Sequence, residues 1–336
     1  MRKVELELHY QNYIENPPVS PTMMKSQAAS NDTTTIDHWR QTWKERFLEN
    51  HKKFGPFEPK SIGKLFNINK GRPVIVCGSG PSLKHNGALL KDRGDIVAIS
   101  CLHNFHFFED QDIKIDYYVT LDSGDITHDE VYDGGKNAPE WYWERTKDRV
   151  LLAFMGASTK LLSKWQGPVY YFNCPIPDEE YLKYAESIEN VGPYVSTGGN
   201  VLGASLYIAK AFFGSFVTAL VGADFAFSYD KKFHGWDSKY DASIGHANRV
   251  VDVFGNKILT WPSYYNFKCW FDWVALVVPG IYINCTEGGT WGSFPEGNMM
   301  AVKQMELSKF IFMVNCHEQI KGVCETPVTN DRVLLF

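Results

Sequence analysis

The stretch that decides the fold begins at Gly71 and reads GRPVIVCGSGPSLKHNGALL. Four apolar residues, Val74 to Cys77, are typical of a short buried strand. A turn follows, and after it a helical pattern starts. The turn consists of Gly78, Ser79, Gly80, Pro81 and Ser82. Glycines let the backbone turn sharply, and proline suits the first turn of a helix. The turn is therefore either a tight connection alone or a set of backbone N–H groups that binds a phosphate.

Outward from this stretch, short apolar runs alternate with helical patterns, and each run is followed by Gly, Ser, Asn or Asp. The runs are PVIVCG, DIVAISC, DYYVTLD, RVLLAFM, PVYYFN, FVTALVGAD and GIYINCT. Continuous hydrophobicity is typical of strands that are covered on both faces. We therefore predict an α/β fold with a mostly parallel sheet, helices on both faces, and ligands at the carboxyl ends of the strands.

The N-terminal part of the chain has a different composition. Residues 1–16 alternate weakly, as an edge strand does, and the following PPVSPTMMKSQAASNDTTT favours a flexible linker, so we predict a tail and linker over residues 1–35. Ile36, Trp39, Trp43 and Phe47 then recur at helical spacing. They predict an amphipathic helix extension over residues 36–60 that packs on the main domain, with a partner-binding helix as the alternative.

The main domain is predicted over residues 61–315 and a C-terminal tail over residues 316–336. The segment MMAVKQMELSKFIFMVN, near the end of the main domain, is interpreted as its closing helix. A chain of 336 residues is long enough for one large α/β domain with such appendages, or for two domains.

The composition of the chain argues against several classes of function. The net charge of −5 and the lack of a Lys/Arg cluster argue against nucleic-acid binding. Seven scattered cysteines without a C-x-x-C pair indicate reduced thiols, and we expect a cytoplasmic protein. The N-terminus lacks the apolar run of a signal peptide, and the apolar stretch from Leu202 to Phe227 is interrupted too often for a membrane span.

A second glycine-containing turn precedes a later helix. It reads STGGN, and its candidate binding residues are Ser196, Thr197, Gly198 and Asn200. Hydroxyl and amide groups at a helix start can bind an anion or a ribose, although an ordinary N-cap explains them equally. Two such turns in one sheet protein can converge on one ligand, so both are candidate nucleotide-binding elements.

Acidic residues and histidines follow the predicted strands. Asp122 and Asp224 each end an apolar run and could hold a ribose hydroxyl, orient a base or bind a metal, with an N-cap as the alternative. No metal site is assigned, because no His/Cys/Asp set has zinc spacing. His234 and His246 lie in a polar segment after Asp224. Because histidine exchanges a proton near neutral pH, either could be a general base.

Several of these segments, in this order, resemble a known superfamily. They are PVIVCGSGPSL, TLDSGD, STGGNVLGASLYIAKAFFG, VTALVGADFAFS, KKFHG, DVFGNKILT and YINCTEGGTWGS. They are similar to the domain shared by archaeal 6-hydroxymethylpterin pyrophosphokinases (MptE-like) and motility-associated factor (Maf) flagellin glycosyltransferases, which in turn resembles bacterial sialyltransferases that use CMP-sialic acid. The resemblance spans about residues 61–310 and implies a Rossmann-like three-layer sandwich that binds a nucleotide.

The resemblance also implies roles for residues. Gly78 to Ser82 would approach the nucleotide phosphate or sugar, Ser100 would lie near the nucleoside, and Ser196, Thr197 and Gly198 would touch the base or phosphate. Asp122 and Asn200 complete the nucleotide-binding set, and Asp224 joins the catalytic set. The sialyltransferases imply His246 as the base, whereas the Maf and pterin-kinase branch implies His234.

Three functions follow. The first is a glycosyltransferase that moves a sugar, such as a nonulosonate from a CMP-sugar, to a hydroxyl of a glycan, protein or small-molecule acceptor. The second is an MptE-like pyrophosphokinase that uses ATP and Mg²⁺ on a pterin-like alcohol, with Asp122 and Asp224 as ligands. The third is a non-catalytic nucleotide-binding module. We favour the glycosyltransferase, for which no cofactor beyond the donor substrate is assigned, because the aromatic-rich chain carries an N-terminal extension.

Overall fold

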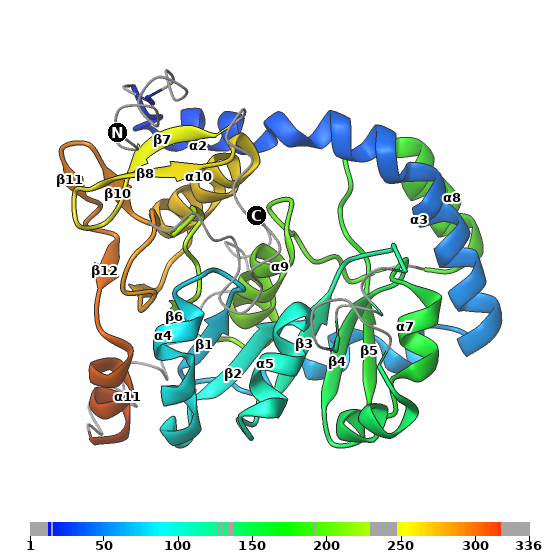
Figure 1. Cartoon of the computed structure of the whole chain (residues 1–336). Helices are drawn as coiled ribbons and strands as arrows, with labels where there is room; N and C mark the ends of the chain where they lie inside the picture. Colours follow the sequence, from blue (N-terminus) through cyan, green and yellow to red (C-terminus); the bar gives the residue numbers. More distant parts are fainter. Residues whose placement is uncertain are drawn as a thin grey trace, which may run out of the picture.

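The computed structural model of the chain describes residues 13–14, 16–125, 128, 131–132, 138–190, 192–228 and 247–316. Its centre is a sheet of eight strands in the order β12-β9-β6-β1-β2-β3-β4-β5 (Figure 1). The strands are β1 (Val74–Cys77), β2 (Val97–Cys101), β3 (Tyr117–Thr120), β4 (Val150–Phe154), β5 (Val169–Phe172), β6 (Val217–Val221), β9 (Ile281–Asn284) and β12 (Val302–Gln304). All neighbouring pairs are parallel. The α/β fold predicted from the apolar runs and the Rossmann-like architecture implied by the resemblance are therefore confirmed.

Helices lie on both faces of the sheet. Successive strands from β1 to β5 step in one direction, so their right-handed connections lie on one face, whereas the chain returns over the other face to reach β6. The connections on the first face include α4 (Leu83–Asn86), α5 (Phe105–Asp110) and α7 (Thr159–Lys164). The other face carries α9 (Val201–Tyr207), which packs against β1, β2 and β3. Helix α10 (Pro262–Val277) lies beyond the carboxyl edge of the sheet (Figure 1).

The strand order reverses between β1 and β6. Strands β2 to β5 lie on one side of β1, and β6 pairs with its other side in register, Val76 beside Leu220. Ligands of open α/β sheets bind outside the carboxyl ends of the strands at such a switch point. The turn after β1 therefore lies directly beside the turn after β6.

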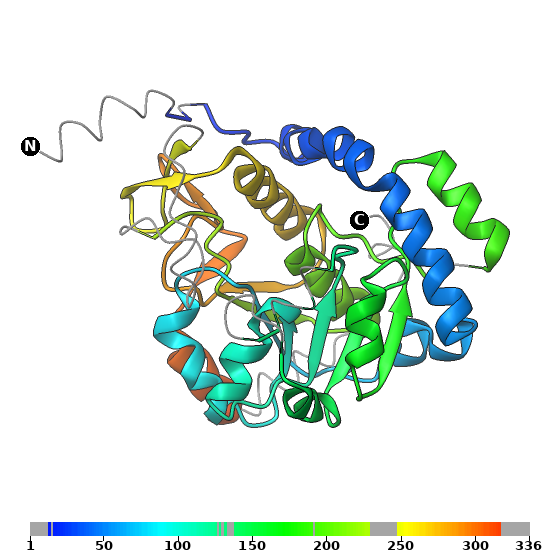
Figure 2. The same ribbon diagram turned by 45° about the vertical axis from the view of Figure 1, so that its right-hand side comes forward.

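The N-terminal segment crosses the carboxyl edge of the sheet (Figures 1 and 2). Helix α2 (Pro21–Ala28) packs on α10, and Gln27 Nε2 donates a hydrogen bond to Asn266 Oδ1 at 2.6 Å. Helix α3 (Asp32–Phe54) continues to α8 (Glu179–Ile188), where Arg40 pairs with Asp178. The segment therefore bridges two separate parts of the sheet domain.

Helix α2 corrects the expectation of a flexible linker before residue 36. Ser20 caps this helix by accepting a hydrogen bond from the Met23 N–H at 3.3 Å, and Pro21 occupies its first turn. Met24 is buried. A Ser-Pro pair is a helix-start signal, but the burial that makes so short a helix stable comes from α10 and cannot be read locally.

Two further elements differ from the sequence prediction. The predicted closing helix is divided, because Val302–Gln304 form edge strand β12 beside β9, and helix α11 begins at Leu307 and ends at Cys316. In addition, β7 (Asn248–Val251) and β8 (Lys257–Thr260) form an antiparallel hairpin that the sequence pattern did not reveal. A second small hairpin joins β10 (Ser293–Phe294) to β11 (Gly297–Asn298).

Candidate functional site

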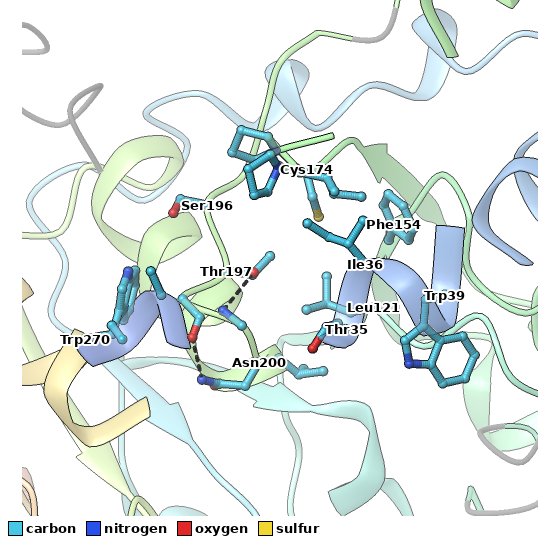
Figure 3. Close-up of a pocket in the computed structure, with 18 of the residues that line it drawn as sticks. Thr35, Ile36, Trp39, Leu121, Phe154, Cys174, Ser196, Thr197, Asn200 and Trp270 are labelled. Carbon is cyan, nitrogen blue, oxygen red and sulfur yellow. Dashed lines mark hydrogen bonds between the residues drawn. The ribbon is translucent and has the colours of Figure 1, made fainter. Parts of the chain in front are cut away.

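A pocket of about 780 Å³ lies at the carboxyl edge of the sheet, below the N-terminal helices (Figure 3). Its floor comes from the end of β4 and from the residues that follow β3 and β5. One wall comes from the turn before α9, and the roof comes from α2, α3 and α10. The lining residues include Lys25, Ile36, Trp39, Trp43, Leu121–Ser123, Phe154, Cys174–Pro177, Ser196–Val201, Trp270 and Trp273. A pocket of this size accommodates a nucleotide-sized ligand.

The turn before α9 is shaped by its own hydrogen bonds. Asn200 is the N-cap of α9, because its Oδ1 accepts a hydrogen bond from the Gly203 N–H at 2.8 Å. Thr197 Oγ1 accepts one from the Gly199 N–H at 3.1 Å. Gly198 has a φ of +54°, and a Cβ at this position would lie 2.3 Å from the ring of Trp270. A glycine is therefore required here, both by the backbone conformation and by the close approach of Trp270.

This turn presents unused donors to the pocket. Among the residues that the structure describes, the N–H groups of Thr197 and Gly198 and the hydroxyl of Ser196 have no hydrogen-bond partner. All three residues line the pocket, as does the ammonium-bearing Lys25, which lies 5.1 Å from the ring centroid of Trp273. Backbone donors and a cation together favour an anionic ligand group.

The loop after β3 brings Asp122 to the pocket. The Ser158 N–H donates to the Asp122 carbonyl at 2.9 Å. Asp125 Oδ1 accepts hydrogen bonds from Arg46 Nη2 at 3.0 Å and from Ser158 Oγ at 2.9 Å. The loop is thereby fixed from two sides. Asp122 is the one carboxylate among the described residues that line the pocket.

The glycine-rich turn after β1 lies elsewhere, and its donors are engaged. The Gly78 N–H donates to the Val221 carbonyl at 2.8 Å, and the Gly80 N–H donates to the Gly222 carbonyl at 2.9 Å. The Ser82 hydroxyl donates to Asp224 Oδ2 at 2.7 Å. None of the residues from Gly78 to Ser82 lines the described pocket. Their packing against the turn after β6 accounts for the two glycines.

The carboxyl group of Asp224 occupies the place at the first turn where an anionic ligand would bind. Its Oδ2 also accepts the Ser82 N–H at 3.4 Å, and a Cβ on Gly80 would lie 2.0 Å from the same oxygen. Burial raises the pKa of Asp224 to about 7, although its hydrogen bonds with Ser82 act in the opposite direction. A phosphate at the first turn would therefore compete with the carboxyl group of the chain itself.

The remaining candidates fall into two groups. Ser100 is fully buried and accepts a hydrogen bond from Asn104 Nδ2 at 2.9 Å, so it belongs to the packing below the first turn. His234 and His246 lie outside the described residues. Of the nucleotide-binding set, the structure brings Asp122, Ser196, Thr197, Gly198 and Asn200 together at one pocket. It separates them from Asp224, Ser100 and the residues Gly78 to Ser82.

The residues that form the roof of the pocket were not among the predicted site residues. Lys25 and Trp39 come from the N-terminal segment, and Trp270 and Trp273 come from α10. One local signal for this role was present, since Trp39 and Trp43 are four residues apart and face the same side of a helix. No local signal connects either residue to α10, which follows more than two hundred residues later.

No described helix is long and apolar enough to cross a membrane. Within the same residues, no group of three or more His, Cys, Asp and Glu side chains could hold a metal ion. The described cysteines all have free thiols.

The family model "6-hydroxymethylpterin diphosphokinase MptE-like" matches residues 45–230, which confirms the predicted resemblance to the MptE-like domain and supports a transferase-type protein. No curated protein matches the chain. A solved structure of the Maf glycosyltransferase from Magnetospirillum magneticum AMB-1 aligns with a TM-score of 0.49 and 14% identity, over 79% of this chain. The chain spans 40% of the length of that structure.

Proposed function

The chain belongs to the 6-hydroxymethylpterin diphosphokinase MptE-like family, and from this premise we propose that it is a nucleotide-dependent transferase. The pocket beside the Ser196–Val201 turn is its donor site, and glycosyl transfer from a nucleotide sugar, such as a CMP-nonulosonate, is the favoured reaction. The observation that carries the proposal is the set of unused donors on Ser196, Thr197 and Gly198 that line this pocket. These donors and Lys25 would hold the phosphate of the donor.

The chemistry follows from these positions. The hydroxyl oxygen of the acceptor forms a bond to the anomeric carbon of the sugar, while the bond from that carbon to the phosphate oxygen breaks. The proton of the acceptor hydroxyl passes to a general base, for which His246 and His234 remain the predicted groups. Hydrogen bonds to the departing phosphate stabilise its growing negative charge. Asp122, at the pocket floor, is suited to accept hydrogen bonds from ribose hydroxyls.

The second candidate is the diphosphokinase activity that the family description names. Diphosphoryl transfer from ATP requires Mg²⁺ on the phosphates and carboxylates to hold it. Asp122 and Asp224 were the predicted ligands, but Asp224 is hydrogen-bonded to Ser82 and does not line the pocket with Asp122. The separation of these two carboxylates is why we favour glycosyl transfer.

Ligand-dependent thermal stability tests the proposal. The protein is heated with CMP, CDP, UDP, GDP or ATP, each with and without Mg²⁺, because a ligand that binds the native state raises Tm. We expect a rise with CMP that does not depend on Mg²⁺. A rise with ATP that requires Mg²⁺ would favour the diphosphokinase, and no rise with any nucleotide would contradict nucleotide binding.

Lys25 provides a matched pair of variants. In Lys25→Ala the affinity for the nucleotide should fall about tenfold, because a charge-assisted hydrogen bond to phosphate is lost. In Lys309→Ala, which removes an exposed lysine of α11, the affinity should stay unchanged. Equal affinities for both variants in isothermal titration calorimetry would remove Lys25 from the donor site.

A further inference from the structure

The pocket has two chemically different sides. Figure 3 shows Trp39, Ile36 and Phe154 on one side and Trp270 on the other, with Thr197 and Asn200 between them. The side near Thr197 carries the unused donors described above. The side that contains Trp39 consists mainly of aromatic and aliphatic side chains, with the Thr35 hydroxyl among them, and we call it the Trp39 side.

Among the described residues, the wall of the Trp39 side that follows β5 has no unpaired backbone N–H group. The wall after β5 reads Cys174-Pro175-Ile176-Pro177, and its two prolines have no N–H. The Cys174 N–H donates to Asn173 Oδ1 at 3.0 Å, and the Ile176 N–H donates to the Cys174 carbonyl at 2.8 Å. At this wall a sugar or a heteroaromatic amide would find no backbone N–H group for its acceptors, whereas an apolar group needs none.

Trp39 is not needed for the core. Ile36 and Phe154 belong to the hydrophobic core, whereas Trp39 is half-buried and, in the described part of the chain, does not pack against that core. Its indole contacts His38 at a centroid distance of 5.0 Å and lines the pocket. A large aromatic side chain that lines a pocket without supporting the core is suited to ligand contact.

Trp39 also lies outside the matched family region, which begins at residue 45. The N-terminal segment that carries Trp39 is anchored at both ends, by Gln27 to Asn266 of α10 and by Arg40 to Asp178 beside α8. The backbone that carries the indole is therefore held in place beside the pocket. Residues of a pocket that come from outside the shared domain are positions where one chain can differ from its relatives in specificity.

We propose that the Trp39 side of the pocket binds an uncharged apolar group of the acceptor, either an alkyl chain or an unsubstituted aromatic ring, and that Trp39 is the residue that selects it. This inference rests on the proposed function, because it assigns the other side of the pocket to the nucleotide. The acceptor then carries its reacting hydroxyl next to this apolar group, so that the hydroxyl lies toward the donor phosphate.

The test uses small probes of defined chemistry. Binding of 2-naphthylmethanol, glucose and 6-hydroxymethylpterin is measured by saturation-transfer NMR and calorimetry, with and without CMP. The variants are Trp39→Ala and the matched control Trp141→Ala, which removes a tryptophan that is 58% exposed on the surface. We expect 2-naphthylmethanol to bind the wild type, with an affinity about tenfold lower in Trp39→Ala and unchanged in Trp141→Ala.

The outcomes separate the two proposals. Equal affinity of 2-naphthylmethanol for the wild type and Trp39→Ala overturns the inference, and so does its displacement by glucose or by 6-hydroxymethylpterin. Both variants should keep the wild-type Tm, which excludes unfolding as the cause of a loss. Nucleotide binding should persist in Trp39→Ala. If the wild type binds no nucleotide, the proposed function fails whatever the probes show.

Discussion

Two turns of this chain have similar sequences and different surroundings. The turn from Gly78 to Ser82 and the turn from Ser196 to Asn200 both place glycines and hydroxyls between an extended segment and a helix. In the first turn, the N–H groups of both glycines donate to carbonyl groups at the end of β6, and Asp224 accepts a hydrogen bond from Ser82. In the second, Ser196, Thr197 and Gly198 keep donors that line the pocket. The motif therefore supplies hydrogen-bond donors, but the segment that packs beside each turn determines whether these donors are available.

The reason lies in the sheet. The first turn leaves β1, whose neighbour β6 ends beside it and brings the carbonyl of Gly222 within 2.9 Å of the Gly80 nitrogen. The second turn leaves an irregular segment that is joined to Asn173 by a single bridge, so no strand continues beside it. Substitutions in the two turns should therefore differ in their effects on stability and on nucleotide binding.

The first prediction concerns Gly80→Val. The new Cβ would lie 2.0 Å from Asp224 Oδ2 and 2.7 Å from the Gly222 carbonyl oxygen, so we expect a loss of at least about 3 kcal/mol in the free energy of unfolding. Urea denaturation measures it. The control Gly288→Val meets no atom within 4 Å and should lose far less. If Gly80→Val kept the wild-type stability but bound no nucleotide, the first turn would be the one that binds the phosphate.

The second prediction concerns the pH dependence that Asp224 confers. Its pKa is raised to about 7 in the folded protein, so between about pH 4 and pH 7 the unfolded chain binds fewer protons than the folded one. Asp224 therefore lowers stability as the pH rises through this range, by at most about 1.4 kcal/mol per pH unit. In Asp224→Asn this slope should disappear. An unchanged slope in denaturation curves from pH 4 to pH 8 would contradict the buried, protonated carboxyl.

The third prediction concerns Ser82→Ala. This variant loses the 2.7 Å hydrogen bond to Asp224, and we expect the free energy of unfolding to fall by about 1–2 kcal/mol. Because the first turn is packed rather than open, nucleotide affinity should stay within about twofold of the wild type. Calorimetric titration and thermal denaturation of the same sample measure both quantities. If the binding free energy of the nucleotide fell by more than the free energy of unfolding, the first turn, and not the second, would be the nucleotide-binding turn.

The fourth and smallest effect on folding is expected for Ser196→Ala. The Ser196 hydroxyl has no partner in the described structure, so stability should change by less than about 0.5 kcal/mol. Nucleotide affinity should fall by about five- to tenfold, because a donor to the ligand is removed. Ser26→Ala, at an exposed position of α2, is the control and should alter neither quantity. If Ser196→Ala binds like this control, the second turn is an N-cap alone.

Much of the fold could be predicted because strands and their ends carry local signals. Each of the seven apolar runs became a strand, and the helix expected from Ile36 was found, beginning at Asp32. Strand β12 was missed because three residues with a single buried member, Val302, form no pattern. Helix α2 was missed because its eight residues are polar in composition and become stable through contacts with α10.

Several residues of the candidate site could be identified from the sequence, but the distant segments that complete the pocket could not. Asp122 was chosen from a strand end, and a glycine-containing turn before a helix indicated Ser196, Thr197, Gly198 and Asn200. All five residues line one pocket. Trp39 and Trp270 could not be paired across the chain from sequence, since no local spacing joins them. The catalytic assignments to His234 and His246 stay predictions, because both residues lie outside the described structure.

By itself, the sequence determined the parallel sheet and the positions of its loops, because apolar runs and turn residues act over a few positions. Tertiary structure alone decided which loop is open. The N–H groups of Gly78 and Gly80 are occupied because β6 lies beside β1, and those near Ser196 are free because no strand lies there. Hydrogen-bond donors are a property of the residue, but their availability depends on neighbours that the fold brings from distant parts of the chain.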